Sequence, residues 1–579
     1  MTGPEQSTAT TVGMRHHLTP LQLDSLAAGR HDVAALDELR RSQFSRRLLL
    51  LRAVLHYARA SPSCVGPLPA ADVAWQLLTE AQRRDAEVVL DVLSHPQVGM
   101  WVAHVLRRFR GGGTDSAPLW FHVGYLHALA AAAAIRVGLS FRLSVPCRAG
   151  DVVLPTLGSA RVDNAAEWGF IEIRAVAGKT TLVDDDGWRP MLTLHDHIRL
   201  DDIDPYRGLD NPVRQDPLPD KETARWHEQF TAAWGLLSQR HPDQAAELAM
   251  GMRALVPLHA TARFRVHSAS VENGFGGALM SRPADAEQLA VTMVHEFQHS
   301  KLAAVQHLAE LLVPGSPAVH HAPWRDDPRP PAGLLQGVFA FTAVTEFWAE
   351  HIADNPLAQF EFAHWRDQTA STLRTLRAQP ALTELGRRFV DTVASRLEPL
   401  QSLEVPTAIG TLARATAIDH RASWQVRHLR PAGEYVEDAV SAWLAGNPAP
   451  TGYTARVVPA TEIQRLDVKA VLSRVWISEP AEFESLRATP AEVAGAAAGD
   501  FAVVTGDPAA TRLYLTELAA DPDRAGAWSG LGLSLAANGS DAANALLERP
   551  ELVRAIYLRA VRQTRRAPDV EKLAAWLTG

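Results

Sequence analysis

The stretch Val294-His295-Glu296-Phe297-Gln298-His299 has the pattern H-E-x-x-H and predicts both the local fold and the chemistry of this chain. Residues four apart share one face of an α-helix, so the imidazoles of His295 and His299 can bind a single metal ion with Glu296 beside it. Apolar residues surround the pair from 289 to 302. The sequence therefore predicts a buried metal-binding helix. The alternative is two buried histidines that neighbouring groups satisfy without a metal.

Signals upstream of the motif support a helix that begins just before it. Asp285 follows a proline and is a favourable N-cap. Residues 264–270 and 274–280 alternate as short strands do. A strand that precedes such a helix can hold an extended peptide along its edge, next to the metal. Zinc peptidases use this arrangement, and two different functions could do so.

Composition limits the class of protein. The 579 residues are 47% hydrophobic, enough for several domains, and the net charge of −8 comes from evenly mixed acidic and basic residues, which argues against a nucleic-acid partner. Only Cys64 and Cys147 are present, which excludes a disulfide scaffold and a cysteine-ligated cluster and favours the reducing cytoplasm. The chain has no long apolar run and no apolar segment near residue 1, so we expect no membrane partner and no secretory signal.

The pattern of periodicities predicts a mainly α fold with a small β-rich part. We divide the chain into a disordered tail, an N-terminal helical lobe, a β-rich insert with a linker, a metal-site domain, a helical lobe and a C-terminal helical region: 1–13, 14–140, 141–220, 221–355, 356–480 and 481–579. The acidic run at 184–187 predicts a polar hairpin turn rather than a calcium site. Residues 528–532 match the opening of a tetratricopeptide repeat, in a single copy that predicts one helical hairpin.

The third metal ligand separates two enzyme classes. A zinc peptidase uses two histidines, a third ligand and Glu296 as the general base, whereas a non-haem iron oxygenase leaves positions open for a 2-oxo acid and dioxygen. The metzincin continuation is absent, because Leu302 and Val305 stand where glycine and histidine are needed. The sequence leaves four candidates for the third ligand: Gln336, Glu346, His320 and His321.

A proline-rich loop follows the motif helix, Ala322-Pro323-Trp324-Arg325-Asp326-Asp327-Pro328-Arg329-Pro330-Pro331. The prolines stiffen it, so the guanidinium groups of Arg325 and Arg329 are held in place and can bind carboxylates in a forked geometry. The alternative is that both arginines form salt bridges with neighbouring aspartates.

Several of these stretches together resemble a known family. The run from Leu279 to Pro283, the motif through Leu302, the loop above and Gly333-Leu334-Leu335-Gln336-Gly337-Val338-Phe339-Ala340-Phe341 are similar to the HEXXH-motif domain family of 2-oxoglutarate-dependent peptide β-hydroxylases. The resemblance implies Fe(II), 2-oxoglutarate and dioxygen, and a ribosomally synthesised precursor peptide hydroxylated at a β-carbon. Some members are fused to a radical SAM domain. Here no C-x-x-x-C-x-x-C motif occurs, so such a maturase would be a separate partner. Members carry histidine at the position of Gln336 or of Phe341, and this chain has neither.

Our expectation is a cytoplasmic Fe(II)- and 2-oxoglutarate-dependent peptide hydroxylase. His295, His299 and Gln336 would bind the metal, Arg325 or Arg329 would hold the distal carboxylate of 2-oxoglutarate, and Glu296 would orient a ligand or water. One alternative is a zinc metallopeptidase with Glu296 as the general base. The other is an inactive scaffold that binds the precursor peptide.

Overall fold

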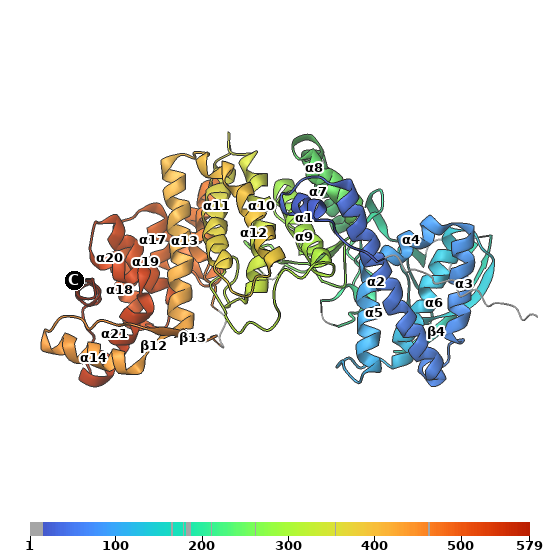
Figure 1. The fold of residues 1–579 in the computed structure, drawn as a ribbon, viewed down its shortest axis with the longest axis horizontal. Coiled ribbons are helices and arrows are strands. Elements are labelled where there is room, and N and C mark those ends of the chain that lie inside the picture. Colours follow the sequence, from blue (N-terminus) through green and yellow to red (C-terminus); the bar gives the residue numbers. More distant parts are fainter. Residues whose placement is uncertain are drawn as a thin grey trace, which may run out of the picture.

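The protein is described here from a computed structural model, which covers residues 15–163, 166–177, 179–180, 187–209, 211–260, 262–353, 355–460 and 464–578. The chain is mainly helical with a small β part, which confirms the predicted fold class. Figure 1 shows an elongated, curved body with the early helices at one end and the last helices at the other. The expected tail at 1–13 lies outside the described residues, as does most of the expected turn at 184–187.

Helices at the N-terminal end enclose one nearly fully buried helix. This helix, α6 (Leu119–Arg136), is buried from Phe121 to Ala134, as its apolar and Ala-rich sequence requires. Its neighbours along the chain are α2 (Val33–Ala60), α3 (Ala71–Arg84), α4 (Ala86–Ser94), α5 (Pro96–Phe109) and a 3-10 turn at Pro62–Val65. The first helix, α1 (Pro20–Ala27), instead packs against α12 (Glu384–Leu397) in the middle of the molecule.

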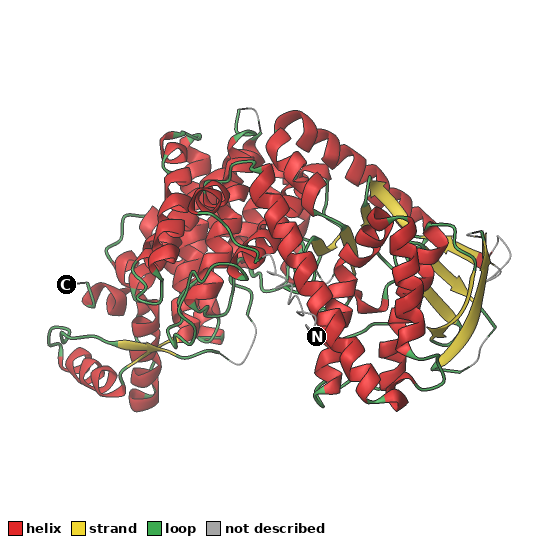
Figure 2. Ribbon diagram, turned by 45° about the vertical axis from the view of Figure 1, so that its right-hand side comes forward, coloured by secondary structure: helices red, strands yellow, loops and turns green. Residues whose placement is uncertain are grey.

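A small β part packs against α6, where period-two alternation predicted it. Figure 2 shows most strands gathered at this end of the molecule. One three-stranded sheet has the order β1-β4-β5 and the other β2-β3-β6. The strands are β1 (Phe141–Cys147), β2 (Asp151–Leu154), β3 (Gly158–Arg161), β4 (Gly169–Val176), β5 (Lys179–Thr180) and β6 (Trp188–Pro190).

A five-stranded sheet lies beside the motif helix and has the order β10-β11-β9-β8-β7. Its members are β7 (Leu192–His195), β8 (Ile198–Leu200), β9 (Ala254–Leu258), β10 (Ser268–Ala269) and β11 (Gly277–Ser281). The strands expected at 264–270 and 274–280 thus form, in shorter versions. Residues 192–200 also belong to this sheet. The domain boundary expected at residue 220 therefore falls between strands of a single sheet. The buried strands β8 and β9 pair in parallel although they are more than 50 residues apart in the chain, so no local pattern could show this pairing.

The remaining helices complete the central and C-terminal parts. They are α7 (Asp220–Arg240), α8 (Pro242–Gly251), α9 (Ala286–Gln306), α10 (Pro331–Ala349), α11 (Pro356–Arg377), α13 (Thr407–His428), α14 (Gly433–Ala445), α15 (Val468–Ser478), α16 (Pro480–Ala488), α17 (Ala498–Thr505), α18 (Ala510–Ala520), α19 (Ala525–Ala537), α20 (Ala542–Glu548), α21 (Pro550–Thr564) and α22 (Val570–Trp576). Strands β12 (Leu429–Pro431) and β13 (Ala455–Val457) form a separate pair. Further 3-10 turns lie at Pro205–Arg207, Pro399–Ser402 and Pro490–Glu492.

Buried charges join α13, α15 and α17 in the C-terminal part. The ammonium of Lys469 lies 2.8 Å from Asp419 and 3.0 Å from Asp500, and all three side chains are buried. The hairpin expected to begin near residue 528 is formed by α19 and α20, which pack against each other, and Trp528 is fully buried in it. Among the described residues, no helix is both long and apolar enough to cross a membrane.

Candidate metal centre

The two motif histidines meet on one face of α9. Asp285 caps this helix by accepting the backbone N–H of Gln288 at 2.8 Å. The Nε2 atoms of His295 and His299 lie 3.1 Å apart. Two nitrogens bound to one ion at about 2.1 Å are separated by about 3.0 Å in octahedral and about 3.4 Å in tetrahedral geometry. The local helix geometry therefore places both imidazoles at the separation that a shared metal ion requires.

Gln336 lies on the other side of His299 and does not face the Nε2 pair. Its Oε1 is 3.0 Å from Nδ1 of His299, and its Nε2 donates to Oε1 of Gln306 at 2.8 Å. The amide oxygen accepts the Nδ1 proton, which leaves the Nε2 lone pair of His299 free for a metal. In this arrangement Gln336 orients His299 and fixes its tautomer, because the two ring nitrogens point in different directions. The ligand role expected for Gln336 from the sequence stays a prediction.

Glu296 lies beside the pair in a buried position. Its Oε1 is 3.9 Å from Nε2 of His295, and His299 and the side chains of Ser268 and Ser270 counteract part of the effect of burial on the pKa of its carboxyl. Burial raises the pKa of the Glu296 carboxyl, while burial and then His299 lower the pKa of His295. Oε2 of Glu296 is buried and has no hydrogen-bond partner among the described residues. An unsatisfied buried carboxylate oxygen next to two neutral imidazoles is a donor set that fits a divalent cation.

Aromatic side chains line one side of His295. The ring of Phe341 lies 4.8 Å from that of His295, and it stacks on Trp324 at 5.0 Å and on Trp365 at 4.0 Å. Gly337 lies directly under Trp324, since a Cβ at this position would come within 1.9 Å of the indole. The position from which α10 could have offered a ligand to His295 thus holds an apolar ring.

Two of the other third-ligand candidates have side-chain partners elsewhere. Glu346 pairs with Arg396, and His321 Nε2 lies 2.9 Å from His420 Nδ1. The backbone of His320 bridges to Arg329, and its Nε2 is buried without a hydrogen-bond partner among the described residues. In the described part of the chain, no further His, Cys, Asp or Glu side chain lies close enough to join both His295 and His299. The pair therefore has only Glu296 as an adjacent acidic group.

His295 opens into a large cavity of about 940 Å³. Strand β10 lies on the edge of its sheet, and Ser268 of that strand contributes to the lining. The other charged and imidazole groups of the lining include Arg265, His267, Arg325, Asp326, Asp327, Glu361, His364, His420, Arg427, His428, Arg465, Asp467 and Arg474. The volume lies at the upper end of the range for small-molecule sites, about 300 to 1,000 Å³, and accommodates an extended peptide segment beside a cofactor.

The two loop arginines share one aspartate. Arg325 donates its Nε to Asp327 at 2.9 Å, and Arg329 donates to the other oxygen of Asp327 at 3.1 Å. This is the salt-bridge alternative expected from the sequence. Arg325 lines the cavity that contains His295, and Arg329 is not among the lining residues. Of the two, Arg325 is therefore the residue placed to meet an anionic cosubstrate.

Two further clusters of metal-ligating side chains lie in the N-terminal part and were not anticipated from the sequence. They are His104, Asp115 and His122, and His95, Asp201 and Asp204. In each cluster the histidines and aspartates come from different parts of the chain, so no local sequence spacing predicts the cluster.

The first cluster is already satisfied by protein groups. Arg108 donates a hydrogen bond to Asp115 at 2.7 Å, and Nε2 of His122 lies 2.9 Å from the same carboxylate. Burial by itself would raise the pKa of Asp115, but these hydrogen bonds outweigh it and lower the pKa to about 2. A guanidinium bound to the central carboxylate disfavours a second cation there.

The second cluster is closed by Tyr125, which donates to Asp204. Burial, together with the neighbouring Asp201 carboxylate, raises the pKa of Asp204 to about 8. This buried acid thus keeps its proton at neutral pH, and the cluster carries less negative charge than its composition suggests.

Comparisons with known proteins leave the family open: a scan against protein-family models finds no match, and a search of curated proteins finds no relative. The resemblance to HEXXH-motif peptide hydroxylases therefore stands as a proposal, and the site geometry has to support it.

Proposed function

We propose that the chain is an Fe(II)- and 2-oxoglutarate-dependent oxygenase that hydroxylates a β-carbon in a ribosomally synthesised precursor peptide. The observation that carries the proposal is the His295 and His299 pair, which opens into a large cavity. Among the described residues, no third His, Cys, Asp or Glu side chain lies close to both rings. Few protein ligands leave several coordination positions for a chelating 2-oxo acid and dioxygen. A zinc peptidase site ordinarily has three protein ligands and one water.

The residues of this chain have separable roles in the proposal. His295 and His299 would hold the metal, and Gln336 keeps His299 in the tautomer that exposes its Nε2 lone pair. Glu296 would orient a water or supply the negative charge that the two neutral imidazoles lack. Bound Fe(II) with 2-oxoglutarate and dioxygen supplies the oxidation, in which R–H, dioxygen and 2-oxoglutarate give R–OH, succinate and carbon dioxide.

The cavity wall supports the choice of ligands. Arg325 lines the cavity and would bind the distal carboxylate of 2-oxoglutarate, in exchange for part of its contact with Asp327. Phe341, Trp324 and Trp365 form an apolar layer that keeps bulk water away from His295. The peptide would lie along the edge of β10, since backbone groups of an edge strand can pair with an extended chain.

A cytoplasmic location fits this proposal. The two cysteines of the chain, Cys64 and Cys147, are both buried. A separate radical SAM maturase would act on the same precursor peptide.

The test is anaerobic reconstitution with Fe(II), followed by addition of 2-oxoglutarate and air. We expect succinate to form in the wild type and not in His299→Ala, and to form faster with the precursor peptide encoded nearby in the genome. Formation of succinate by wild type and His299→Ala at the same rate would refute the assignment. So would purified protein that binds no divalent metal, which is the result expected of an inactive scaffold.

A zinc metallopeptidase is the second candidate, and the buried Glu296 next to His295 favours it. In that case Glu296 would deprotonate a metal-bound water. Zinc-supported cleavage of peptides without 2-oxoglutarate, lost in Glu296→Gln, would establish the peptidase and overturn the oxygenase.

A further inference from the structure

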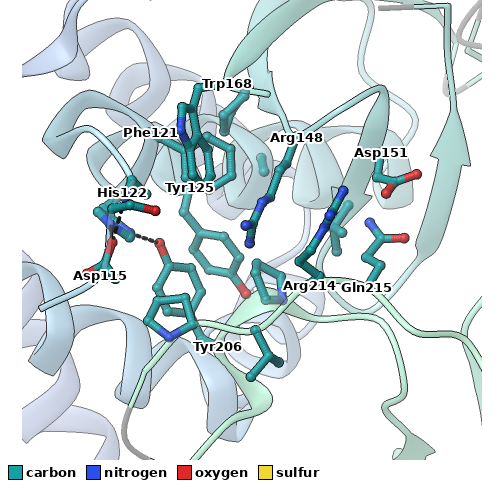
Figure 3. A pocket seen from close by; sticks show the side chains of 18 of the residues that line it. Asp115, Phe121, His122, Tyr125, Arg148, Asp151, Trp168, Tyr206, Arg214 and Gln215 are labelled. Atoms are coloured by element: carbon teal, nitrogen blue, oxygen red, sulfur yellow. Dashed lines mark hydrogen bonds and ion pairs between the residues drawn. The ribbon is translucent and has the colours of Figure 1, made fainter. Parts of the chain in front are cut away.

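A second cavity lies in the N-terminal part, between α6 and the small sheets. Its volume is about 370 Å³, within the range of about 300 to 1,000 Å³ found for small-molecule sites. Figure 3 shows its walls. The lining residues that carry the argument come from α6, from loops next to β1 and β4, from the turn Pro205–Arg207 and from the loop after it: Phe121, Tyr125, Arg148, Trp168, Tyr206 and Arg214.

Aromatic rings form two walls of this pocket. Phe121 and Trp168 meet edge to face at 4.8 Å, and Tyr125 and Tyr206 do the same at 4.8 Å. Such rings offer a flat, apolar surface and favour a planar ligand.

Two guanidinium groups enter the same space, as Figure 3 shows. Arg148 lies 4.5 Å from the centre of the Trp168 ring and donates to Glu167 at 3.0 Å, which fixes its direction. The guanidinium of Arg214 has no ion-pair partner within the part of the chain that the structure describes. Asp151 and Asp115 also line the cavity, and these carboxylates pair with Arg161 at 3.2 Å and with Arg108 at 2.7 Å. The acidic lining groups are thus paired with arginines outside the pocket. Two guanidinium groups that face one cavity, of which only Arg148 has an acidic partner among the described residues, can therefore bind an anion.

The opposite wall carries a fixed hydrogen-bond chain. Nε2 of His122 lies 2.9 Å from Asp115 and must donate to the carboxylate, so Nδ1 accepts the hydroxyl proton of Tyr206 at 2.9 Å. Burial raises the pKa of Tyr206, so its hydroxyl stays protonated. The Tyr206 oxygen therefore retains lone pairs for a donor group at the end of a ligand remote from the arginines.

We propose that this pocket binds a small planar aromatic anion, an aryl carboxylate or aryl phosphate, at a site separate from the His295 cavity. The anionic group contacts Arg148 and Arg214, and the ring packs between the two aromatic walls. None of these residues lines the cavity at His295. The proposal thus holds whether or not the oxygenase assignment is correct.

The experiment is calorimetric titration of the full chain with benzoate and with phenyl phosphate, in a buffer free of other aryl anions. Binding of at least one is expected, and which of them binds more tightly identifies the anionic group. Benzyl alcohol has the ring without the charge, and inorganic phosphate has the charge without the ring. Each is expected to bind at least about tenfold more weakly than the preferred aryl anion, because a charge-assisted hydrogen bond contributes about a factor of ten or more.

The matched variants are Arg214→Ala and Arg142→Ala. Arg142 is an exposed arginine of the same part of the molecule, paired with Glu172 and absent from the pocket lining. Arg214→Ala should weaken binding at least about tenfold, Arg214→Lys less, and Arg142→Ala not measurably. Equal binding to Arg214→Ala and wild type would overturn the proposal. Absence of binding by both aryl anions up to about 10 mM would do the same, since even modest ligand efficiency predicts detectable affinity. Melting curves verify that the variants are folded.

Discussion

The hydrogen bond from His299 to Gln336 predicts the effect of Gln336→Leu on metal affinity. Leucine has nearly the same size but cannot accept the Nδ1 proton, which now lies 3.0 Å from the amide oxygen. His299 then loses the group that fixes its tautomer and raises its basicity. Losses of this kind reduce metal affinity about 10- to 100-fold, or about 1.4 to 2.7 kcal/mol. We expect that range for Gln336→Leu.

The assay is competition for Fe(II) or Co(II) against a chromophoric chelator, under anaerobic conditions and with melting curves as the folding control. Gln336→Glu keeps an acceptor for the Nδ1 proton and should retain the affinity. Gln306→Leu removes only the group that anchors the amide of Gln336 at 2.8 Å, and its effect should be smaller. His299→Ala removes a ligand and should lose the most.

Two outcomes would refute this reasoning. Unchanged affinity in Gln336→Leu would mean that the amide does not control His299. A loss as large as that of His299→Ala would mean that Gln336 is itself a ligand, as first expected from the sequence, and that metal binding rearranges α9 against α10.

Three other predictions concern stability and the cavity wall. Lys469→Met leaves the buried Asp419 carboxylate without its cation, while Asp500 keeps its ion pair with Arg524. The change should lower the free energy of unfolding by about 3 to 5 kcal/mol in urea titrations. The same change at the exposed Lys572 should have little effect, and similar losses in both variants would contradict the prediction. The pKa of Asp204 is raised to about 8, so between about pH 4 and 8 the folded state retains a proton that the unfolded state releases, and stability falls with rising pH by up to about 1.4 kcal/mol per unit. Asp204→Asn should therefore gain stability relative to wild type between pH 5 and pH 7.5, and parallel pH profiles would disprove the burial effect. Gly337→Ala places a Cβ within 1.9 Å of an indole of the cavity wall, so it should lower the free energy of unfolding by about 1 to 3 kcal/mol and slow succinate formation. The control is Gly433→Ala, where a Cβ meets nothing within 4 Å. Equal stability and equal rates of the two variants would count against this packing.

Local patterns determined the parts of the site that depend on one element. The four-residue spacing of His295 and His299 fixes their separation as soon as the helix forms, and the cap at Asp285 and the buried face of α9 follow from residues close in sequence. The mainly helical class and the small β part follow from the periods of apolar residues. The proline-rich loop also holds Arg325 and Arg329 in fixed positions, where both donate to Asp327.

The tertiary structure alone decided what surrounds the pair. Whether Gln336 coordinates a metal or orients His299 depends on how α10 packs against α9, and that packing also places Phe341 over His295. The pairing of β8 with β9 and the pocket beneath Trp168 likewise join residues that are far apart in the chain. Sequence spacing determines geometry within one helix, because hydrogen bonds between neighbours set it. Geometry between elements is set by burial of side chains from both, and neither segment contains that information by itself.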